Sequence, residues 1–226
     1  PVNVCSKFIG VFIIFGAFLE RTGIGDFFIQ ISNAVVGRFS GGPAKVAVVA
    51  SAFEGMVSGS SVANTVGSGS VTIPLMKKTG YKPEFAAAAE ASASTGGQIM
   101  PPILGAAAFL MADYVQIPYA QIALKAILPA VLYFTGVFIT VHLEAKKLGL
   151  RGLTKEELPR LLPLLKQSYL LLPLVLLVYL VSTSQRSIQY AAALAIVAAI
   201  VVSLFNKDNR ITLGKIWEAL ATGGQG

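Results

Sequence analysis

Apolar stretches separated by short polar or basic segments run along most of the chain. Residues 6–19 are apolar apart from Ser6 and Lys7, and a helix needs ~20 such residues to cross the hydrocarbon of a membrane. The pattern therefore predicts a crossing helix here. Further helices are predicted at 24–37, which crosses obliquely or lies at the interface, and at 117–143, 169–181 (with a start near Leu164) and 190–205. We expect a polytopic, all-α integral membrane bundle.

Two shorter apolar segments, 44–57 and 62–76, follow Gly41-Gly42-Pro43, which is typical of a helix start. Each segment is too short to cross a bilayer alone. We therefore expect a re-entrant helical hairpin that enters the membrane and returns, with its tip at Ser58-Gly59-Ser60-Ser61.

Residues 85–112 are long enough to cross, but Gly96-Gly97 and Pro101-Pro102 interrupt them. Neither pair sustains a helix interior, so we predict a broken transmembrane helix, with two half-helices meeting in mid-membrane. Discontinuous helices expose carbonyls that bind cations and N-termini that face anions. Two alternatives remain open: close packing of small residues at the tip, and a proline kink that binds nothing.

Intramembrane acids are functional candidates by default. Glu90 shares a helical face with Ser94 and Gly97, so it is a proton or cation partner, or it pairs with a buried donor. Glu54 is a weaker candidate of the same kind, and we expect Asp113 to be solvated at the interface. His142, the single histidine, is predicted to be interfacial.

Composition supports the membrane assignment, because 54% of the 226 residues are hydrophobic, only 13% are charged, and the mean hydropathy is +0.70. Soluble domains carry about twice that charged share. The net charge of +7 comes from short basic clusters between apolar stretches, which argues against nucleic-acid binding. The single Cys5 excludes an internal disulfide and is expected to be a packing residue.

The charge map orients the predicted topology. Most basic residues fall on one side, whether the hairpin returns or its arms cross, and such an excess marks the cytoplasmic side. They are Lys45, Lys77, Lys78, Lys82, Lys146, Lys147, Arg151, Lys155, Arg160, Lys166, Lys207 and Arg210, while Arg186 lies opposite. We therefore expect the hairpin to enter from the cytoplasm. A chain that begins at Pro1 without a Met also suggests an internal part of a longer protein.

Three runs carry a family resemblance: GMVSGSSVAN at 55–64, IPLMKKTGY at 73–81 and ASTGGQIMPP at 93–102. They resemble the large membrane subunit of tripartite ATP-independent periplasmic (TRAP) transporters. GGPAK at 41–45, FLMAD at 109–113 and VHLEAK at 141–146 are similar to the fused-permease branch that works with TAXI-type binding proteins. The resemblance is strong over about residues 1–160.

This resemblance implies an elevator-type secondary transporter in the inner membrane of a prokaryote, without enzymatic activity or an organic cofactor. Na⁺ would be the coupling ion, and the solute a small organic, carboxylate-bearing anion. Expected partners are a periplasmic TAXI-type binding protein, a small membrane subunit or its fused equivalent, and membrane lipid. The chain would hold the first half of an inverted repeat, so it would carry half a site.

By motif position, the resemblance places one Na⁺ site at the hairpin tip and the helix break. Its candidate residues are Ser58, Ser60, Ser61, Asn64, Thr65, Gly67, Thr95, Gly96 and Gly97. Ser94, Gln98, Pro101, Pro102 and Glu90 would lie near the substrate or at the break.

The predicted organisation follows from these features. It comprises scaffold-type helices at 1–42, a transport-domain hairpin and broken helix at 43–116, a span at 117–145, a basic cytoplasmic loop at 146–166, two spans at 167–206 and the start of a second repeat at 207–226.

Two other functions remain as hypotheses. An intramembrane serine hydrolase would use Ser58 or Ser60 as its nucleophile, but it would need a histidine base, and His142 is predicted at the wrong depth. A non-transporting assembly subunit would use the glycines and serines for helix packing alone.

Overall fold

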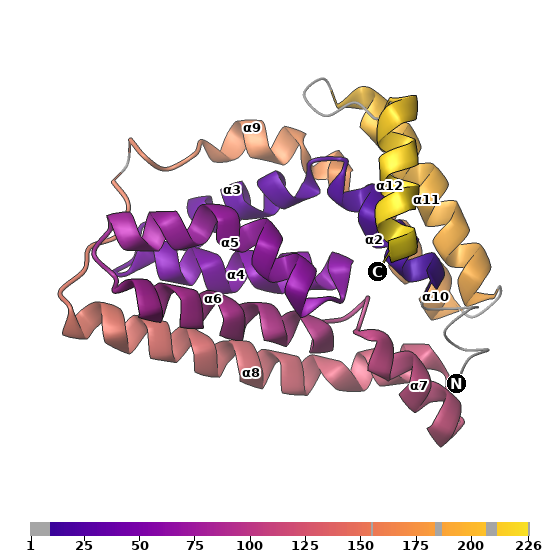
Figure 1. The fold of residues 1–226 in the computed structure, drawn as a ribbon, viewed down its shortest axis with the longest axis horizontal. Coiled ribbons are helices and arrows are strands. Elements are labelled where there is room, and N and C mark those ends of the chain that lie inside the picture. The colour runs from indigo at the N-terminus through magenta and orange to yellow at the C-terminus, as the bar shows by residue number, and fades with distance from the viewer. Residues whose placement is uncertain (1–9, 155, 184–186, 207–211, 226) are drawn as a thin grey trace. The chain divides into compact units, whose positions relative to one another are not determined.

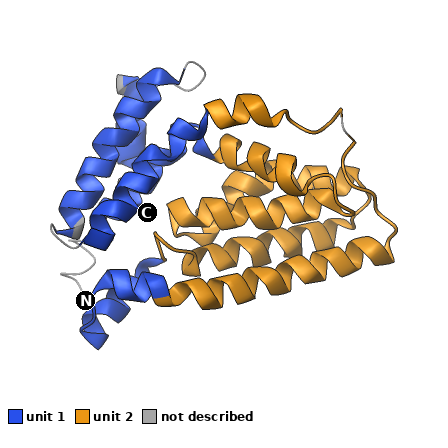
Figure 2. Ribbon diagram, turned by 180° about the vertical axis from the view of Figure 1, so that it is seen from behind, with its two compact units in different colours: residues 1–24, 105–124, 167–226 blue, residues 25–104, 125–166 orange. Residues whose placement is uncertain are grey.

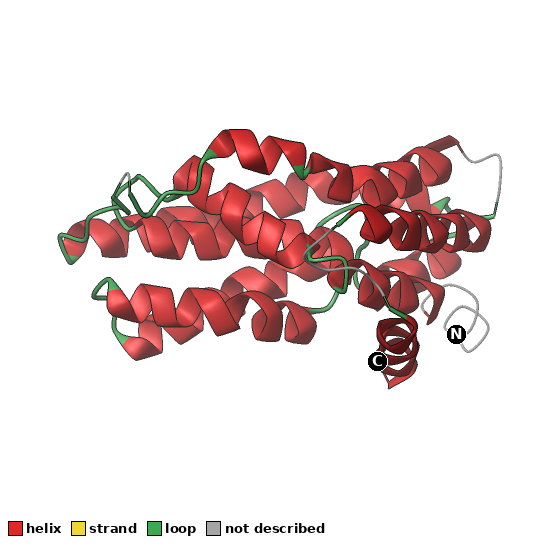
Figure 3. Cartoon of the chain, turned by 90° about the horizontal axis from the view of Figure 1, so that it is seen from above, coloured by secondary structure: helices red, strands yellow, loops and turns green. Residues whose placement is uncertain are grey.

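The structure is a computed structural model that describes residues 10–154, 156–183, 187–206 and 212–225. All regular elements in these ranges are helices (Figure 3). Several residues used above lie outside the described part: Cys5, residues 6–9 of the first predicted span, Lys155, Arg186, Lys207 and Arg210.

The chain divides into two compact units (Figure 2). Unit 1 comprises Pro1–Ile24, Gly105–Leu124 and Gln167–Gly226, and unit 2 comprises Gly25–Leu104 and Lys125–Lys166. One division falls directly after Leu104, within the predicted helix break. The hairpin and the residues of the break up to Leu104 therefore belong to unit 2.

Unit 2 is built on a helical hairpin. Helix α4 (Gly42–Ser58) and helix α5 (Ser61–Lys78) pack against each other and against α6 (Pro83–Gly96), which continues into the short 3₁₀ helix η2 (Gly97–Ile99) (Figure 1). The unit also holds most of α3 (Ile24–Val36), most of α8 (Tyr119–Lys147) and the short α9 (Leu161–Lys166). Helix α9 lies in the segment predicted to be a basic loop.

Local chemistry explains the sharp turn between α4 and α5. Gly59 ends α4 with a left-handed backbone (φ 58°), and its N–H donates to Gly55 O at 3.1 Å. Ser60 caps α5, because its Oγ accepts from Ala63 N at 3.3 Å. The chain therefore reverses over two residues, both inside the predicted Ser58–Ser61 tip.

Unit 1 contains α2 (Gly10–Glu20), α7 (Ala106–Val115), η3 (Ser168–Leu171), α10 (Leu172–Thr183), α11 (Ile188–Phe205) and α12 (Leu213–Gln225). Helix α2 packs against α11 and α12. Asn206 Nδ2 donates to Thr22 O at 2.9 Å, which ties the end of α11 to the turn after α2. Phe109 stacks on Tyr119 with ring centroids 4.4 Å apart, so α7 is held to the start of α8.

Only α8 among the described helices is both long and apolar enough to cross a membrane by length and composition. The other apolar helices have 10–17 residues, including those at the predicted spans 169–181 and 190–205.

Small residues let the helices of unit 2 approach closely. The core between α4, α6 and α8 contains Ala44, Ala47, Ala89, Ala93 and Ala145, all buried. At the tip end of α4, a Cβ on Gly55 would lie 2.3 Å from Gly97 Cα, which is far inside contact distance. The backbones of α4 and η2 therefore touch, as in other small-residue helix contacts.

Gly55→Ala is expected to lower the stability of the intact protein by about 1–3 kcal/mol, because the new methyl group meets backbone that cannot rotate away. Thermal unfolding of the detergent-purified protein measures the loss. Gly136→Ala in α8 is the matched control, since a Cβ there meets nothing within 4 Å and an alanine favours the helix. Equal unfolding temperatures for the two variants would contradict the proposed backbone contact.

Candidate functional site

The hairpin tip contacts the segment that interrupts the helix after α6. Gln98 Nε2 donates to Ser61 Oγ at 2.8 Å, which links η2 to the first turn of α5. On the other side of the turn, a Cβ on Gly59 would lie 3.0 Å from Leu104 O and 3.1 Å from Ile103 O. The two interruptions in the chain, 37 residues apart at Ser61 and Gln98, therefore meet in space.

Asn64 and Gly97 pack against each other where the hairpin tip meets the helix break. Asn64 is 1% exposed, and its Nδ2 donates to Ser51 O on α4 at 2.8 Å. A Cβ on Gly97 would lie 2.8 Å from the same Nδ2, so no larger residue fits between α5 and η2. The helix break is thus packed directly under the tip.

Oxygen atoms dominate the tip. Ser58 Oγ lies 3.4 Å from both the N and the O of Ser60, and Ser61 O accepts from Thr65 Oγ1 at 2.8 Å. Hydroxyl and carbonyl oxygens of unwound backbone are the ligands that discontinuous helices offer to Na⁺. Ser58, Ser60 and Ser61, with the carbonyls after Gly97, could hold a cation of that kind.

Not every predicted site residue lies at the tip. Thr95 is exposed, and its hydroxyl donates back to Ala91 O at 2.7 Å. Gly96 is buried beneath Tyr133, whose Cε1 would lie 2.6 Å from a Cβ there. Gly67 lies two turns beyond the tip on an exposed part of α5, where a Cβ would be 3.3 Å from Glu54 Oε2. The structure therefore separates these three residues from the tip contact.

Behind the tip, Glu90 is fully buried among hydroxyl groups from three helices. Its Oε1 lies 2.5 Å from Ser68 Oγ, 3.1 Å from Ser51 Oγ and 3.3 Å from Ser94 Oγ, and its Oε2 lies 2.5 Å from Thr72 Oγ1. We call Glu90 with Ser51, Ser68, Thr72 and Ser94 the hydroxyl cluster. It joins α4, α5 and α6 by side-chain hydrogen bonds.

No basic side chain pairs with Glu90 in the part of the chain that the structure describes. The hydroxyl dipoles therefore replace both water and a counter-ion around this carboxyl group. Each hydroxyl carries one proton, and Ser68 also reaches Asn64 O at 2.8 Å, so its contacts compete. Through Ser68, the hydroxyl cluster is therefore linked to Asn64, which packs beneath the hairpin tip.

Comparison with known proteins assigns the chain to a family. The profile of the family described as "Tripartite ATP-independent periplasmic transporter, DctM component" matches residues 3–226. The chain belongs to the DctM family. A C4-dicarboxylate TRAP transporter large permease protein DctM from Vibrio cholerae is 33% identical over 135 residues, which cover 60% of this DctM-family chain and 29% of that protein.

Two further relatives extend the comparison. The protein of the same name from Pseudomonas aeruginosa is 26% identical over 203 residues, 89% of this chain and 47% of that protein. An isethionate TRAP transporter permease protein DctMQ from Oleidesulfovibrio alaskensis is 27% identical over 146 residues, 62% of this chain and 22% of that protein. The DctM-family chain thus spans at most about half the length of these curated relatives.

Sequence reasoning did not single out Ser51, Ser68 and Thr72 in this DctM-family chain. A signal was present, since Asn64, Ser68 and Thr72 recur at four-residue spacing and must share one helical face. All three are buried, as are Glu90, Ser94 and Gly97 on the facing helix. Ser51 carried no such signal, because the other hydroxyl of α4 is Ser58 at the end of the helix, in the tip.

Other candidate residues lie elsewhere. Asp113 is exposed, as expected. His142 belongs to the α8 face that packs near the first turn of α4, whereas Ser58 ends α4. The 17 residues of α4 put those ends about 25 Å apart, so His142 cannot act as a base for the tip serines.

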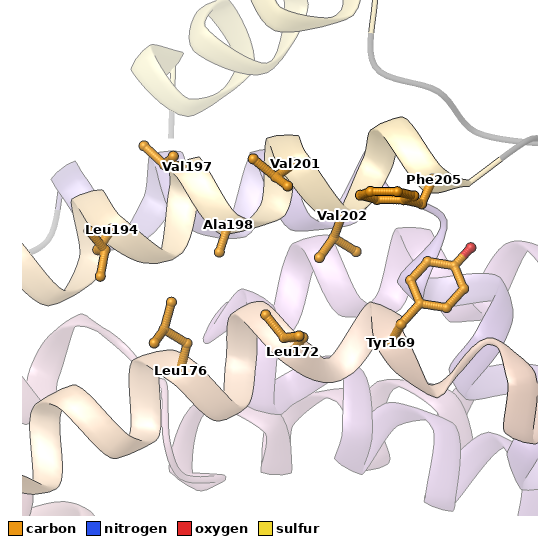
Figure 4. Close-up of a pocket in the computed structure, with 9 residues that line it drawn as sticks. All are labelled: Tyr169, Leu172, Leu176, Leu194, Val197, Ala198, Val201, Val202 and Phe205. Atoms are coloured by element: carbon orange, nitrogen blue, oxygen red, sulfur yellow. The ribbon is translucent and has the colours of Figure 1, made fainter.

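An apolar groove runs between α10 and α11 in unit 1 (Figure 4). Leu172, Leu176, Val197 and Val201 line it, and Tyr169 supplies a phenol at one end. It offers no set of oxygen ligands comparable with the tip. It is therefore not the candidate ion site of this DctM-family chain.

Glu90→Gln is expected to destabilise the intact permease by about 1–3 kcal/mol, because the amide replaces one acceptor oxygen by a donor that faces hydroxyl donors. The measurement is the unfolding temperature of the purified protein. Glu84→Gln, on the exposed part of the same helix, makes the same chemical change and should shift stability by less than about 0.5 kcal/mol. If both variants unfolded together, Glu90 would not depend on the hydroxyl cluster.

Proposed function

We propose that this chain is part of a permease that couples a Na⁺ gradient to the uptake of a small organic, carboxylate-bearing solute across the inner membrane of a prokaryote. The observation that carries the proposal is the contact between the hairpin tip and the helix break, made through Ser61 and Gln98. Two discontinuities that meet in one bundle are the hallmark of a midplane transport site.

In the proposed arrangement the α4–α5 hairpin is re-entrant, and unit 2 belongs to the moving part of an elevator. The polar tip supports re-entrance, since a hydroxyl-rich turn suits a hairpin whose tip is buried in protein or lines a water-filled cavity. The bonds of Ser58 and Ser60 at 3.3–3.4 Å are long, so a cation could replace them at small cost.

The names of the relatives support an anionic solute. Two are called C4-dicarboxylate permeases and one an isethionate permease, and these compounds carry carboxylate or sulfonate groups. Half-helix N-termini and a bound Na⁺ both favour such groups. A periplasmic binding protein of the TAXI type would deliver the solute, and a small membrane subunit, separate or fused, would complete the complex.

Coupling would arise from differential binding. Na⁺ orders the tip by ligation to its hydroxyl and carbonyl oxygens, and the solute binds the ordered form better. By linkage, the solute then raises the affinity for Na⁺ by the same factor. The hydroxyl cluster supplies a rigid base for this change, because it fixes α4, α5 and α6 below the tip.

The test is uptake by the full-length permease with its binding protein in proteoliposomes, using radiolabelled succinate, isethionate and sialic acid as probes. An inward Na⁺ gradient should drive uptake of at least one probe, and a K⁺ gradient should not. Ser61→Ala removes one proposed ligand and should raise the Na⁺ concentration for half-maximal uptake by roughly tenfold, which is about 1.4 kcal/mol.

Ser70→Ala is the matched control, because Ser70 is an exposed hydroxyl on the same helix that donates to Gly67 O. It should leave the Na⁺ dependence unchanged. Equal uptake with and without the Na⁺ gradient would refute Na⁺ coupling, and a proton gradient would then be tested in its place.

A further inference from the structure

The end of unit 2 opposite the tip is strongly basic. The turns before α4 and after α5 meet the C-terminal end of α8 there: Tyr81 OH donates to Gly41 O at 3.3 Å, and Ser40 Oγ donates to Leu150 O at 2.8 Å. We call this the basic end. Its cationic residues are Arg38, Lys45, Lys77, Lys78, Lys82, Lys146, Lys147 and Arg151.

Tyr81 keeps this end closed over the whole physiological range of pH. Burial, and then the negative charge of Glu144, raise the pKa of the phenol to about 12. The hydroxyl therefore stays protonated and continues to donate to Gly41 O.

Lys45 is the unusual residue of the basic end. It lies in the first turn of α4 and is only 3% exposed. Its Nζ stands 5.7 Å from the ring centre of Phe39 and 5.5 Å from that of Phe138. Those rings attract a cation weakly, but the positive end of the α4 dipole opposes it. A buried ammonium in this position needs a stronger partner.

No such partner exists among the described residues. Lys45 makes no hydrogen bond and no ion pair there, so its three N–H donors have no partner among the described side chains and backbone. Two acids of the same end are engaged or exposed: Glu144 lies 3.9 Å from Lys147, and Glu84 faces solvent. Lys146 adds a like charge that acts on Lys45.

A second unused polar atom lies beside Lys45. His142 follows Phe138 by one helical turn, on the α8 face toward Lys45, whose charge acts on the imidazole. His142 Nδ1 is completely enclosed and has no hydrogen-bond partner in the described part of the chain. The ammonium of Lys45 is not enclosed in this way, so a small group can still reach it from outside.

We propose that Lys45, His142 and Lys146 form a binding site for a phosphate group at the basic end. A phosphate supplies the missing negative charge and several acceptor oxygens, so it can bind the ammonium groups of Lys45 and Lys146 together, beside the imidazole of His142. The group comes either from an anionic phospholipid headgroup at the cytoplasmic surface or from a free phosphate ion. The excess of lysine and arginine around the site attracts both.

The test uses the full-length permease purified in a neutral detergent. Its unfolding temperature is titrated with inorganic phosphate as the potassium salt, and separately with short-chain phosphatidylglycerol, against potassium chloride at matched ionic strength. At least one phosphate source should raise the unfolding temperature in a saturable way. Because no sodium is present, a rise in unfolding temperature cannot come from binding at the proposed Na⁺ site.

Lys45→Met keeps the buried stem and removes the charge. It should weaken the phosphate-dependent rise by at least about 30-fold in apparent affinity, while leaving the ligand-free protein as stable as the wild type or more so. Lys77→Met removes an exposed lysine from the same end and is the matched control, with less than about a threefold effect. Lys146→Ala, which leaves the buried core intact, should also weaken binding.

Each outcome of the titrations supports or overturns the proposed phosphate site. A rise with phosphatidylglycerol alone assigns the site to a lipid headgroup, a rise with inorganic phosphate alone assigns it to a soluble ion, and a rise with both supports a shared phosphate site. No rise with either source, or an equal rise in Lys45→Met, overturns the proposal. Because the site is independent of the tip, failure of Na⁺ coupling would leave it unaffected.

Discussion

The structure of unit 2 depends on satisfying polar groups that lie between packed helices. In hydrocarbon, an unpaired hydroxyl or carboxyl group has no water to bond, so it must find its partner within the protein. Glu90 meets this requirement by taking hydroxyl contacts from each of the three packed helices. Removing one helix would leave the carboxyl group exposed to lipid. The hairpin and α6 are therefore stable only as one packed group.

This constraint divides the hairpin into a rigid base and an adaptable tip. At the base, alanines and the Gly55–Gly97 contact bring backbones together, and short hydrogen bonds to Glu90 fix the helices. At the tip, the contacts of Ser58 and Ser60 are 3.3–3.4 Å long, and Gly59 and Ser60 carry the whole reversal of the chain. Rearranging the tip would cost little, whereas rearranging the base would break several buried bonds. The proposed ion site would need both: a tip that can rearrange around the ion, and a base that holds the helices in place.

The sequence predicted the turn between α4 and α5 well, because a Gly-Ser turn depends only on local chemistry. Helical spacing likewise predicted that Glu90, Ser94 and Gly97 share a buried face. Thr95, predicted at the helix break, lies one position away from the buried face, and its hydroxyl donates to its own helix. Spacing along one helix predicts which of its residues share a face. It does not predict which face of a neighbouring helix packs against them.

The partners of Glu90 on the other two helices could not be assigned from the sequence for that reason. Ser51 and Ser68 come from helices whose relative rotation is set by the packing of glycine and alanine across all three. Lys45 is a similar case, because the sequence placed it only among the basic residues of the predicted cytoplasmic side. Its burial depends on Phe39 and Phe138, which come from other parts of the chain.

The two ends of α4 are linked through one rigid helix. Its 17 residues hold Lys45 and the tip about 20–25 Å apart. If a phosphate at the cytoplasmic surface holds Lys45, the tip of a hairpin standing upright would lie deep in a hydrocarbon layer about 30 Å thick. If that phosphate belongs to a lipid headgroup, which stays at the surface, an elevator movement of unit 2 would have to release it, because α4 cannot stretch. Phosphate binding at the basic end would therefore favour the position of unit 2 nearest the cytoplasm, and through α4 it would influence which side of the membrane the tip faces.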